Sequence, residues 1–293
     1  MITVALAGSG HGSGKTMLAY HLAYMLAHMG FGVLAVDLDP QPDLTAGFLD
    51  TEQIEALWGT PGGTVWDGVR HVGKAGGAKP VSPVRVHDGL ALLPGDPALG
   101  EFEDSDGGQG TPFRDIITAA GRTISADIAL VDLGPGMGTI NRSALAAADK
   151  VMVVVTADAF SLRGLSSFGP RLRALDQDQS RTEQIGYVIT TQGSVDSIAE
   201  RAFLERLALI PATYAIHVAG QREADAADQS FEIGRLRDYR SLEPLARSAR
   251  KPMFDLSPGD GAVGATANFV RKCHQDFAEL TRAFASRVDI PAS

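Results

Sequence analysis

The stretch Gly8-Ser-Gly-His-Gly-Ser-Gly-Lys15-Thr16 decides the fold of this chain. The apolar run Ile2–Ala7 before it predicts a buried strand, and Lys15–His28 predicts a helix. Strand, glycine-rich loop ending in Gly-Lys-Thr, and helix is the order that a phosphate-binding loop requires. Glycines let backbone N–H groups converge on phosphate oxygens, Lys15 adds a positive charge, and the Thr16 hydroxyl is a ligand for Mg²⁺. The pattern therefore predicts a nucleotide phosphate site formed by Gly10, His11, Gly12, Ser13, Gly14, Lys15 and Thr16.

Composition narrows the class of protein. The chain has 293 residues, is 44% hydrophobic and carries a net charge of −9, from 26 Lys and Arg against 35 Asp and Glu. Nucleic-acid binding would therefore need a local basic patch on the surface of an otherwise acidic protein. A single cysteine, Cys273, excludes an intrachain disulfide and an all-cysteine metal or iron–sulfur site within one chain. No apolar run is long enough to cross a bilayer and no basic segment precedes the first strand, so we expect a cytoplasmic protein.

Three aspartates stand at the ends of apolar runs. Asp37 and Asp39 follow the predicted strand Phe31–Val36, and Asp132 closes the predicted strand Asp127–Asp132 before a glycine turn. The carboxyl ends of parallel strands form the crevice where open α/β sheets bind ligands. Carboxylates placed there beside a phosphate loop reach Mg²⁺ or its water. We therefore expect these aspartates to complete the site.

Strand and helix patterns alternate along most of the chain. Further strands are predicted at Lys150–Val155, Gln184–Thr190 and Thr213–Ile216, with a hairpin at Val84–Val86 and Leu90–Leu93. Helices are predicted at Thr64–His71, Pro112–Ile124, Asn141–Ala148, Leu162–Leu175, Ile198–Leu209 and, as an amphipathic tail, about 262–288. The rest of 50–110 reads as loop. This order predicts an α/β fold of the P-loop NTPase type, with a doubly wound, mostly parallel sheet covered by helices on both faces. We expect residues 1–293 to form one domain.

A basic cluster lies before the tail. The segment Phe231–Lys251 holds three acidic residues, Glu232, Asp238 and Glu243, and six basic ones: Arg235, Arg237, Arg240, Arg247, Arg250 and Lys251. Its local balance is +3. A charge cluster is usually a solvated face, and residue pattern alone favours that interpretation.

The chain resembles the ParA/MinD superfamily of deviant-Walker ATPases, and most of all its ParA branch. The resemblance rests on the glycine loop and on two further segments, Asp37-Leu-Asp-Pro-Gln41 and Leu130-Val-Asp132-Leu-Gly-Pro. The resemblance implies ATP and Mg²⁺ as cofactors. Lys15 would hold the phosphates, Thr16, Asp37 and Asp132 would surround the metal, and Asp39 would orient the attacking water. It also implies an ATP-dependent homodimer, nonspecific DNA binding through the basic cluster, and slow hydrolysis stimulated by a ParB-like or cargo-adaptor protein.

The loop departs from the family pattern, Lys-Gly-Gly-x-Gly-Lys-Thr, whose first lysine reaches the partner's phosphates across the dimer. Gly10 stands in place of that lysine, and His11 replaces the next glycine. Three interpretations stay open. Another cation substitutes in trans, with His11, Lys150 and Arg163 as candidates; the dimer forms differently; or the protein binds nucleotide with little turnover.

Three functions follow as hypotheses. The favoured one is a nucleoid-associated ATPase that partitions DNA or positions a cargo. The others are a nucleotide-gated adaptor with negligible hydrolysis and a MinD-like membrane-associated ATPase, the last disfavoured by the mixed polar face of the tail helix. A nitrogenase-reductase-like electron carrier is excluded, because a dimer bridged by one cluster needs two cysteines per chain.

Overall fold

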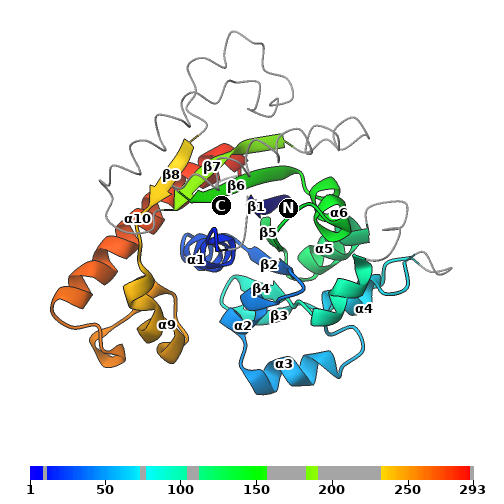
Figure 1. The fold of residues 1–293 in the computed structure, drawn as a ribbon, viewed down its shortest axis with the longest axis horizontal. Helices are drawn as coiled ribbons and strands as arrows, with labels where there is room; N and C mark the ends of the chain where they lie inside the picture. The colour runs from blue at the N-terminus through cyan, green and yellow to red at the C-terminus, as the bar shows by residue number, and fades with distance from the viewer. Residues whose placement is uncertain (9–11, 73–76, 104–111, 157–182, 191–231, 291–293) are drawn as a thin grey trace, which may run out of the picture.

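The computed structural model describes residues 1–8, 12–72, 77–103, 112–156, 183–190 and 232–290 (Figure 1). The described strands form one eight-stranded sheet in the order β3-β4-β2-β5-β1-β6-β7-β8. Every neighbouring pair is parallel except β3–β4, which is antiparallel. The strands are β1 Ile2–Gly8, β2 Val33–Leu38, β3 Val84–His87, β4 Leu90–Leu93, β5 Ile128–Leu133, β6 Lys150–Thr156, β7 Glu183–Thr190 and β8 Glu232–Leu236. The predicted mostly parallel α/β sheet is confirmed.

Helices cover both faces of this sheet, as predicted (Figure 1). The described α-helices are α1 Lys15–His28, α2 Asp43–Phe48, α3 Thr51–Trp58, α4 Val65–Val69, α5 Pro112–Thr123, α6 Thr139–Ala147, α9 Glu243–Ala249 and α10 Ala265–Val288. Val4 and Leu6 of β1 face one core, which α1 and α10 close with fully buried side chains such as Leu22 and Phe277. The alternate residues Ala5 and Ala7 face a second core, closed by α5 and α6. Alternation of side chains along a strand separates the two cores.

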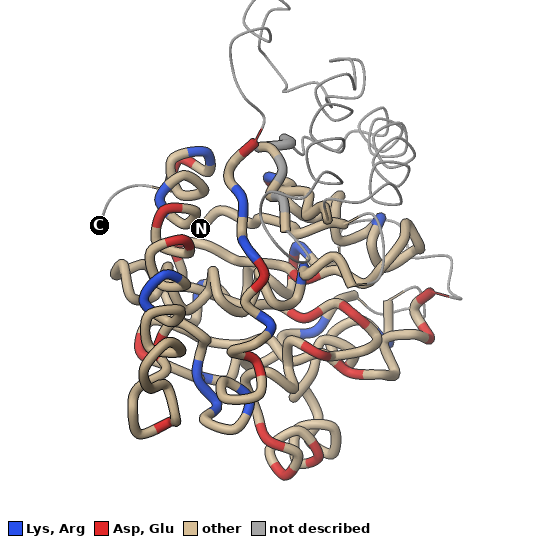
Figure 2. The backbone as a smooth tube through the Cα atoms, turned by 60° about the vertical axis from the view of Figure 1, so that its left-hand side comes forward, with Lys and Arg blue, Asp and Glu red and all other residues tan. Residues whose placement is uncertain are grey.

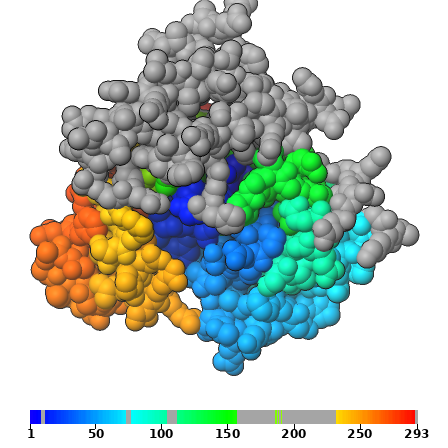
Figure 3. Space-filling view, viewed as in Figure 1, coloured from blue at the N-terminus to red at the C-terminus, as the bar shows by residue number. Residues whose placement is uncertain are grey.

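Several segments differ from the sequence prediction. The stretch treated as loop from Asp50 onward begins with α3, where the Asp50 carboxylate accepts the Gln53 N–H and the Gln53 side chain accepts the Asp50 N–H. This capping box stabilises a helix with no buried residue, which projects from the body of the molecule (Figures 1 and 3). Helix α2 and strand β8 were also missed, and the tail helix begins at Ala265. The predicted elements at 162–175, 198–209 and 213–216 lie outside the described residues.

A buried histidine ties α1 to the C-terminal part of the fold. His21 is 3% exposed; its Nδ1 lies 2.7 Å from the Met17 carbonyl oxygen, and its Nε2 accepts the Met253 N–H at 3.1 Å. These partners require a neutral ring with its hydrogen on Nδ1. The ring also stacks on Phe277 of α10 at a centroid distance of 4.8 Å. Burial lowers the pKa of His21 to about 4. The helix that carries the phosphate loop is thus fixed to α10 through one uncharged side chain.

Acid should therefore weaken the fold through His21. Because the folded-state pKa is depressed, the unfolded chain binds the extra proton between about pH 6.5 and pH 4, and the contribution to stability is lost as pH falls through that window. The shift corresponds to on the order of 3 kcal/mol. We expect His21→Gln, which cannot titrate, to remove this part of the pH dependence. Urea denaturation of both proteins at pH 7 and pH 4 measures it; equal losses on acidification would contradict the assignment.

Candidate functional site

The glycine loop lies at the carboxyl edge of the sheet, between β1 and α1. Its described part contains two glycines in the left-handed region, Gly12 at φ 74° and Gly14 at φ 82°. Gly8 is required for a different reason: a Cβ there would lie 2.7 Å from Ser13 Oγ and 2.9 Å from Lys15 Cδ. The backbone therefore passes close over Ser13 and Lys15. Residues Gly10 and His11 lie outside the described part of the chain.

Lys15 is the buried cation of the site. It is only 6% exposed, and its Nζ lies 3.5 Å from Ser13 Oγ. Burial lowers the pKa of Lys15, while the nearby carboxylates of Asp132 and Asp39 act in the opposite direction. An ammonium held among carboxylates in a desolvated loop is suited to a phosphate oxygen, whose negative charge would offset the cost of burial.

A threonine from a distant strand holds the loop in place. Thr190, the last residue of β7, is 7% exposed, and its hydroxyl lies 3.0 Å from the Ser13 carbonyl oxygen and 3.3 Å from that of Val155. A Cβ on Gly14 would be 3.6 Å from the Thr190 methyl. The sequence prediction did not include Thr190 in the site. The feature that could have indicated it is its position at the carboxyl end of a predicted strand.

Asp37 is fully buried and held by a second threonine. Thr45 in α2 donates its N–H and its hydroxyl to Asp37 Oδ2 at 2.8 and 2.7 Å, and its Oγ1 accepts the Gly95 N–H at 2.8 Å. Gly95 itself must be glycine, since a Cβ would lie 2.8 Å from Asp37 Cγ. Burial, and then the charge of Asp132, raise the pKa of Asp37 to about 8.

Asp132 is the unusual group of the site. It is the register partner of Asp37 on the neighbouring strand, it is fully buried, and neither of its oxygens has a hydrogen-bond partner among the described residues. Burial raises the pKa of Asp132 to about 7. The nearby Thr16 hydroxyl and the positive charge of Lys15 act in the opposite direction, but neither group forms a hydrogen bond with the Asp132 oxygens. Buried charges are normally paired or bound to metal.

This donor set fits a divalent cation. No group of three His, Cys, Asp or Glu side chains in metal-binding geometry occurs in the part of the chain that the structure describes. Mg²⁺ does not need one, because it usually takes one or two carboxylates and completes its shell with phosphate oxygens and water. The unsatisfied oxygens of Asp132, with the Thr16 hydroxyl beside them, supply such a partial set.

Asp39 lies beside the loop that follows β5. Its Oδ1 accepts the Gln41 N–H at 2.8 Å, and its own N–H donates to Asp37 Oδ1 at 3.2 Å. A Cβ on Gly134 would be 3.3 Å from Asp39 Oδ1, so the carboxylate lies on the side of Gly134 where a side chain would project. Asp37, Asp39, Asp132 and Lys15 are therefore brought together, as the sequence predicted.

Lys150, the candidate trans cation that the structure describes, does not lie beside the phosphate loop of its own chain. Lys150 begins β6, at the amino edge of the sheet, whereas the phosphate loop follows the carboxyl end of β1. Its Nζ lies 3.4 Å from the Arg287 carbonyl oxygen and 3.6 Å from Asp289 Oδ2, at the end of α10. Lys150 therefore lies at the edge of the sheet opposite to the phosphate loop of its own chain, and its role toward a partner's phosphates stays a prediction. His11 and Arg163 lie outside the described residues.

The basic cluster is neutralised in space. Each of its six members forms an ion pair with a carboxylate: Arg235 with Glu232, Arg237 with Asp276, Arg240 with Asp238, Arg247 with Glu243, Arg250 with Asp50 and Lys251 with Asp260. Six carboxylates thus face the six cations, and one of them, Asp276, also pairs with Lys272. The balance of +3 counted along the sequence is offset by three partners that other segments contribute: Asp276, Asp50 and Asp260. Figure 2 shows acidic and basic residues interspersed along the backbone.

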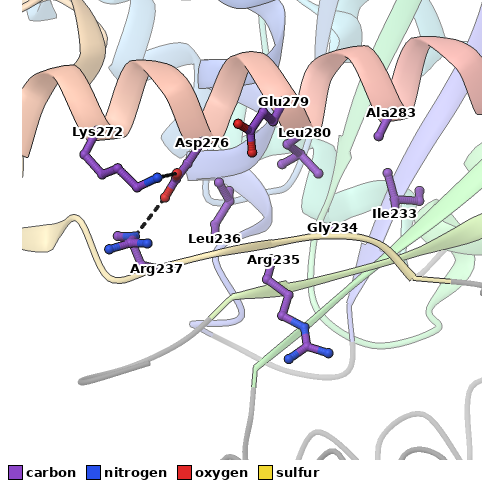
Figure 4. A pocket seen from close by; sticks show the side chains of 10 residues that line it. All are labelled: Ile233, Gly234, Arg235, Leu236, Arg237, Lys272, Asp276, Glu279, Leu280 and Ala283. Atoms are coloured by element: carbon purple, nitrogen blue, oxygen red, sulfur yellow. Dashed lines mark hydrogen bonds and ion pairs between the residues drawn. The ribbon is translucent and has the colours of Figure 1, made fainter. Parts of the chain in front are cut away.

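Arg235 and Arg237 of the basic cluster border a cavity of about 430 Å³ between β8 and α10 (Figure 4). Asp276 accepts from Arg237 at 2.8 Å and from the Tyr239 hydroxyl at 2.6 Å, and it pairs with Lys272 at 2.9 Å. None of the residues lining the cavity belongs to the phosphate site.

Among the described helices, none is both long enough and apolar enough for a membrane span.

Comparison with known proteins decides the family. The model of the AAA_31 family, described as an AAA domain, matches residues 1–185, more than half of the chain. The chain belongs to this family, in the ParA branch of the ParA/MinD superfamily.

Three relatives illustrate the ParA branch. The chromosome-partitioning ATPase Soj of Thermus thermophilus is 33% identical over 183 residues, which are 59% of this chain and 66% of Soj. A putative plasmid partition protein of Borrelia burgdorferi bound to AMPPNP has a TM-score of 0.65 at 18% identity, with 98% of both chains covered. The apo structure of McdA from Cyanothece has a TM-score of 0.65 at 16% identity, covering 97% of this chain and 99% of McdA.

The matches to the two solved structures cover nearly the whole chain. The sequence matches are shorter: across three curated relatives they span 40% to 66% of the relative's own length. The activity and partners of this protein are therefore matters of proposal.

Proposed function

We propose that this protein is an ATPase of the partition or cargo-positioning type, which binds ATP with Mg²⁺, dimerises with ATP and hydrolyses it slowly. The observation that carries the proposal is Asp132, a buried carboxylate without a hydrogen-bond partner among the described residues, one strand from Asp37 and close to Lys15. A group of this kind is costly unless a cation binds it. The named relatives, a partitioning ATPase and a partition protein bound to AMPPNP, support the same function.

Each residue has a defined task in this proposal. The loop from Gly10 to Gly14 surrounds the phosphates, Lys15 neutralises their charge, and Thr16 with Asp132 and Asp37 holds the metal ion. Mg²⁺, when bound, withdraws charge from the phosphate oxygens. Asp39, restrained by Gln41 and Gly134, orients the attacking water. Positioning and electrostatic stabilisation are what phosphoryl transfer requires of a protein.

Partners belong to the same proposal. We infer a ParB-like or cargo-adaptor protein that stimulates hydrolysis, and nonspecific DNA as the surface on which the ATP-bound dimer resides. DNA contact through the basic cluster requires its arginines to exchange carboxylates for phosphates. Exposed ion pairs such as Arg247–Glu243 are weak, about 0 to 1 kcal/mol each, so this exchange is feasible.

Sedimentation velocity with ATP, ADP or no nucleotide tests the proposal, combined with retardation of a DNA duplex over a salt series. We expect ATP and Mg²⁺ to produce a dimer that retards DNA, and Lys15→Ala to abolish both effects. Lys79→Ala, at an exposed position, is the matched control and should behave as wild type. Nucleotide binding without a dimer and without a DNA shift at low salt would instead indicate a nucleotide-gated adaptor.

A further inference from the structure

We propose that Asn141 is a positioning residue of this site, which fixes the loop after β5, Gly134–Gly138, against Asp39. The inference rests on the proposed ATPase function and extends it to a residue outside the phosphate loop and the aspartates. It comes from a set of hydrogen bonds that centre on the first turn of α6.

Asn141 is 4% exposed and satisfies two loop carbonyls at once. Its Nδ2 donates to the Gly134 and Gly136 carbonyl oxygens, both at 2.9 Å. A side-chain amide nitrogen has two hydrogens, so both are used, and the two carbonyl partners fix which end of the amide faces the loop. An aspartate of the same shape would present only acceptors to these carbonyls.

The loop has few other means of holding its shape. It contains three glycines and one proline in five positions, and Gly136 has φ 90°. Glycine leaves the backbone many alternatives, so the Asn141 amide adds a restraint to the one that Met137 supplies by packing against the second core. Gly134, whose carbonyl Asn141 binds, leaves room for Asp39, because a Cβ there would be only 3.3 Å from Asp39 Oδ1. A change in the loop therefore alters the space available to the Asp39 carboxylate.

Glu103 restrains the same helix turn from outside. Its carboxylate accepts the Thr139 N–H at 2.6 Å and the Ile140 N–H at 3.3 Å, and its carbonyl oxygen accepts the Thr139 hydroxyl at 3.2 Å. A negative charge at a helix N-terminus is favourable. Glu103 thus anchors the turn in which Asn141 lies, and Asn141 transmits that position to the loop.

The test compares Asn141→Asp with wild type and with a matched control. Thr281→Val removes a buried hydroxyl that donates to the Phe277 carbonyl oxygen within α10, away from the site, so it costs stability without touching the loop. We expect Asn141→Asp to lower kcat at least tenfold while the Kd of a fluorescent ATP analogue changes less than threefold. Hydrogen exchange of the amides in 133–140 should become faster, and the control should leave all three quantities within twofold.

Two results would overturn the inference. One is unchanged exchange of the amides in 133–140 in the Asn141→Asp protein; the other is a loss of analogue affinity as large as the loss of kcat, which would indicate general damage to the site. Hydrogen exchange decides the matter even when wild type turns over no ATP. In that case the proposed function fails, and the inference on the loop is judged separately.

Discussion

Replacing Asp39 by alanine is expected to reduce ATP turnover by at least about a hundredfold and to leave ATP affinity within about threefold, because a positioned acid–base or water-orienting group contributes about 10² to 10⁴ in rate. Asp39 is not one of the groups that hold the phosphates or the metal in our proposal. Its carboxylate accepts the Gln41 N–H and lies where a side chain at Gly134 would project, so it is oriented by the neighbouring backbone.

Asp39→Asn separates this role from structure, because its side-chain oxygen can still accept the Gln41 N–H. We expect it to be as inactive as the alanine variant but as stable as wild type. Single-turnover hydrolysis and equilibrium binding of ATP measure the two effects. Turnover within tenfold of wild type in both variants would show that another group orients the water.

Replacing Asp132 by asparagine is expected to stabilise the nucleotide-free protein and to abolish the response to Mg²⁺. The folded-state pKa of Asp132 is raised to about 7, so its contribution to stability is present at low pH and lost as pH rises towards that value. Asparagine stays neutral. Relative to the variant, wild type should lose on the order of 2 to 3 kcal/mol between pH 5 and pH 8. Removing the Asp132 charge also removes its repulsion of the Asp37 carboxylate, which adds to the gain in stability.

Chemical denaturation at pH 5 and pH 8, with and without ATP and Mg²⁺, measures this prediction. Asp127→Asn is the control: the Asp127 carboxylate accepts the Gly32 N–H at 2.7 Å just before β5, away from the phosphate loop. It should gain no stability at pH 8 and should keep the stabilisation by Mg²⁺ and ATP. If Asp132→Asn is less stable than wild type at pH 8, the carboxylate has a partner that compensates its burial.

The sequence was sufficient to predict the location of those site residues that depend only on the order of strands, loops and helices along the chain. A glycine loop between a strand and a helix, and aspartates at the ends of apolar runs, fall at the same edge of a parallel sheet whatever the rest of the chain does. The same rule places Lys150, the first residue of a strand, at the opposite edge of the sheet.

The groups that sequence did not reveal act through distant contacts. Thr190 reaches the Ser13 carbonyl from 177 positions away, and Asn141 depends on how a glycine loop turns back on its own helix. Threonine and asparagine are common in loops and at helix starts, so neither residue type is informative alone. The ion pairs of the basic cluster were hidden from the sequence for a related reason, since Asp50 and Asp276 are distant in sequence from the arginines that they contact.

The paired arginines have a thermodynamic consequence. A protein that binds DNA with free cations gains affinity from the ions released by the duplex, and its salt dependence reports the number of phosphates contacted. Here Glu232, Asp238, Glu243 and their counterparts act as counterions that remain attached to the protein. Each displaced carboxylate keeps its charge near the phosphate that replaced it. The salt dependence of binding through this face should therefore be shallower than six contacts would give.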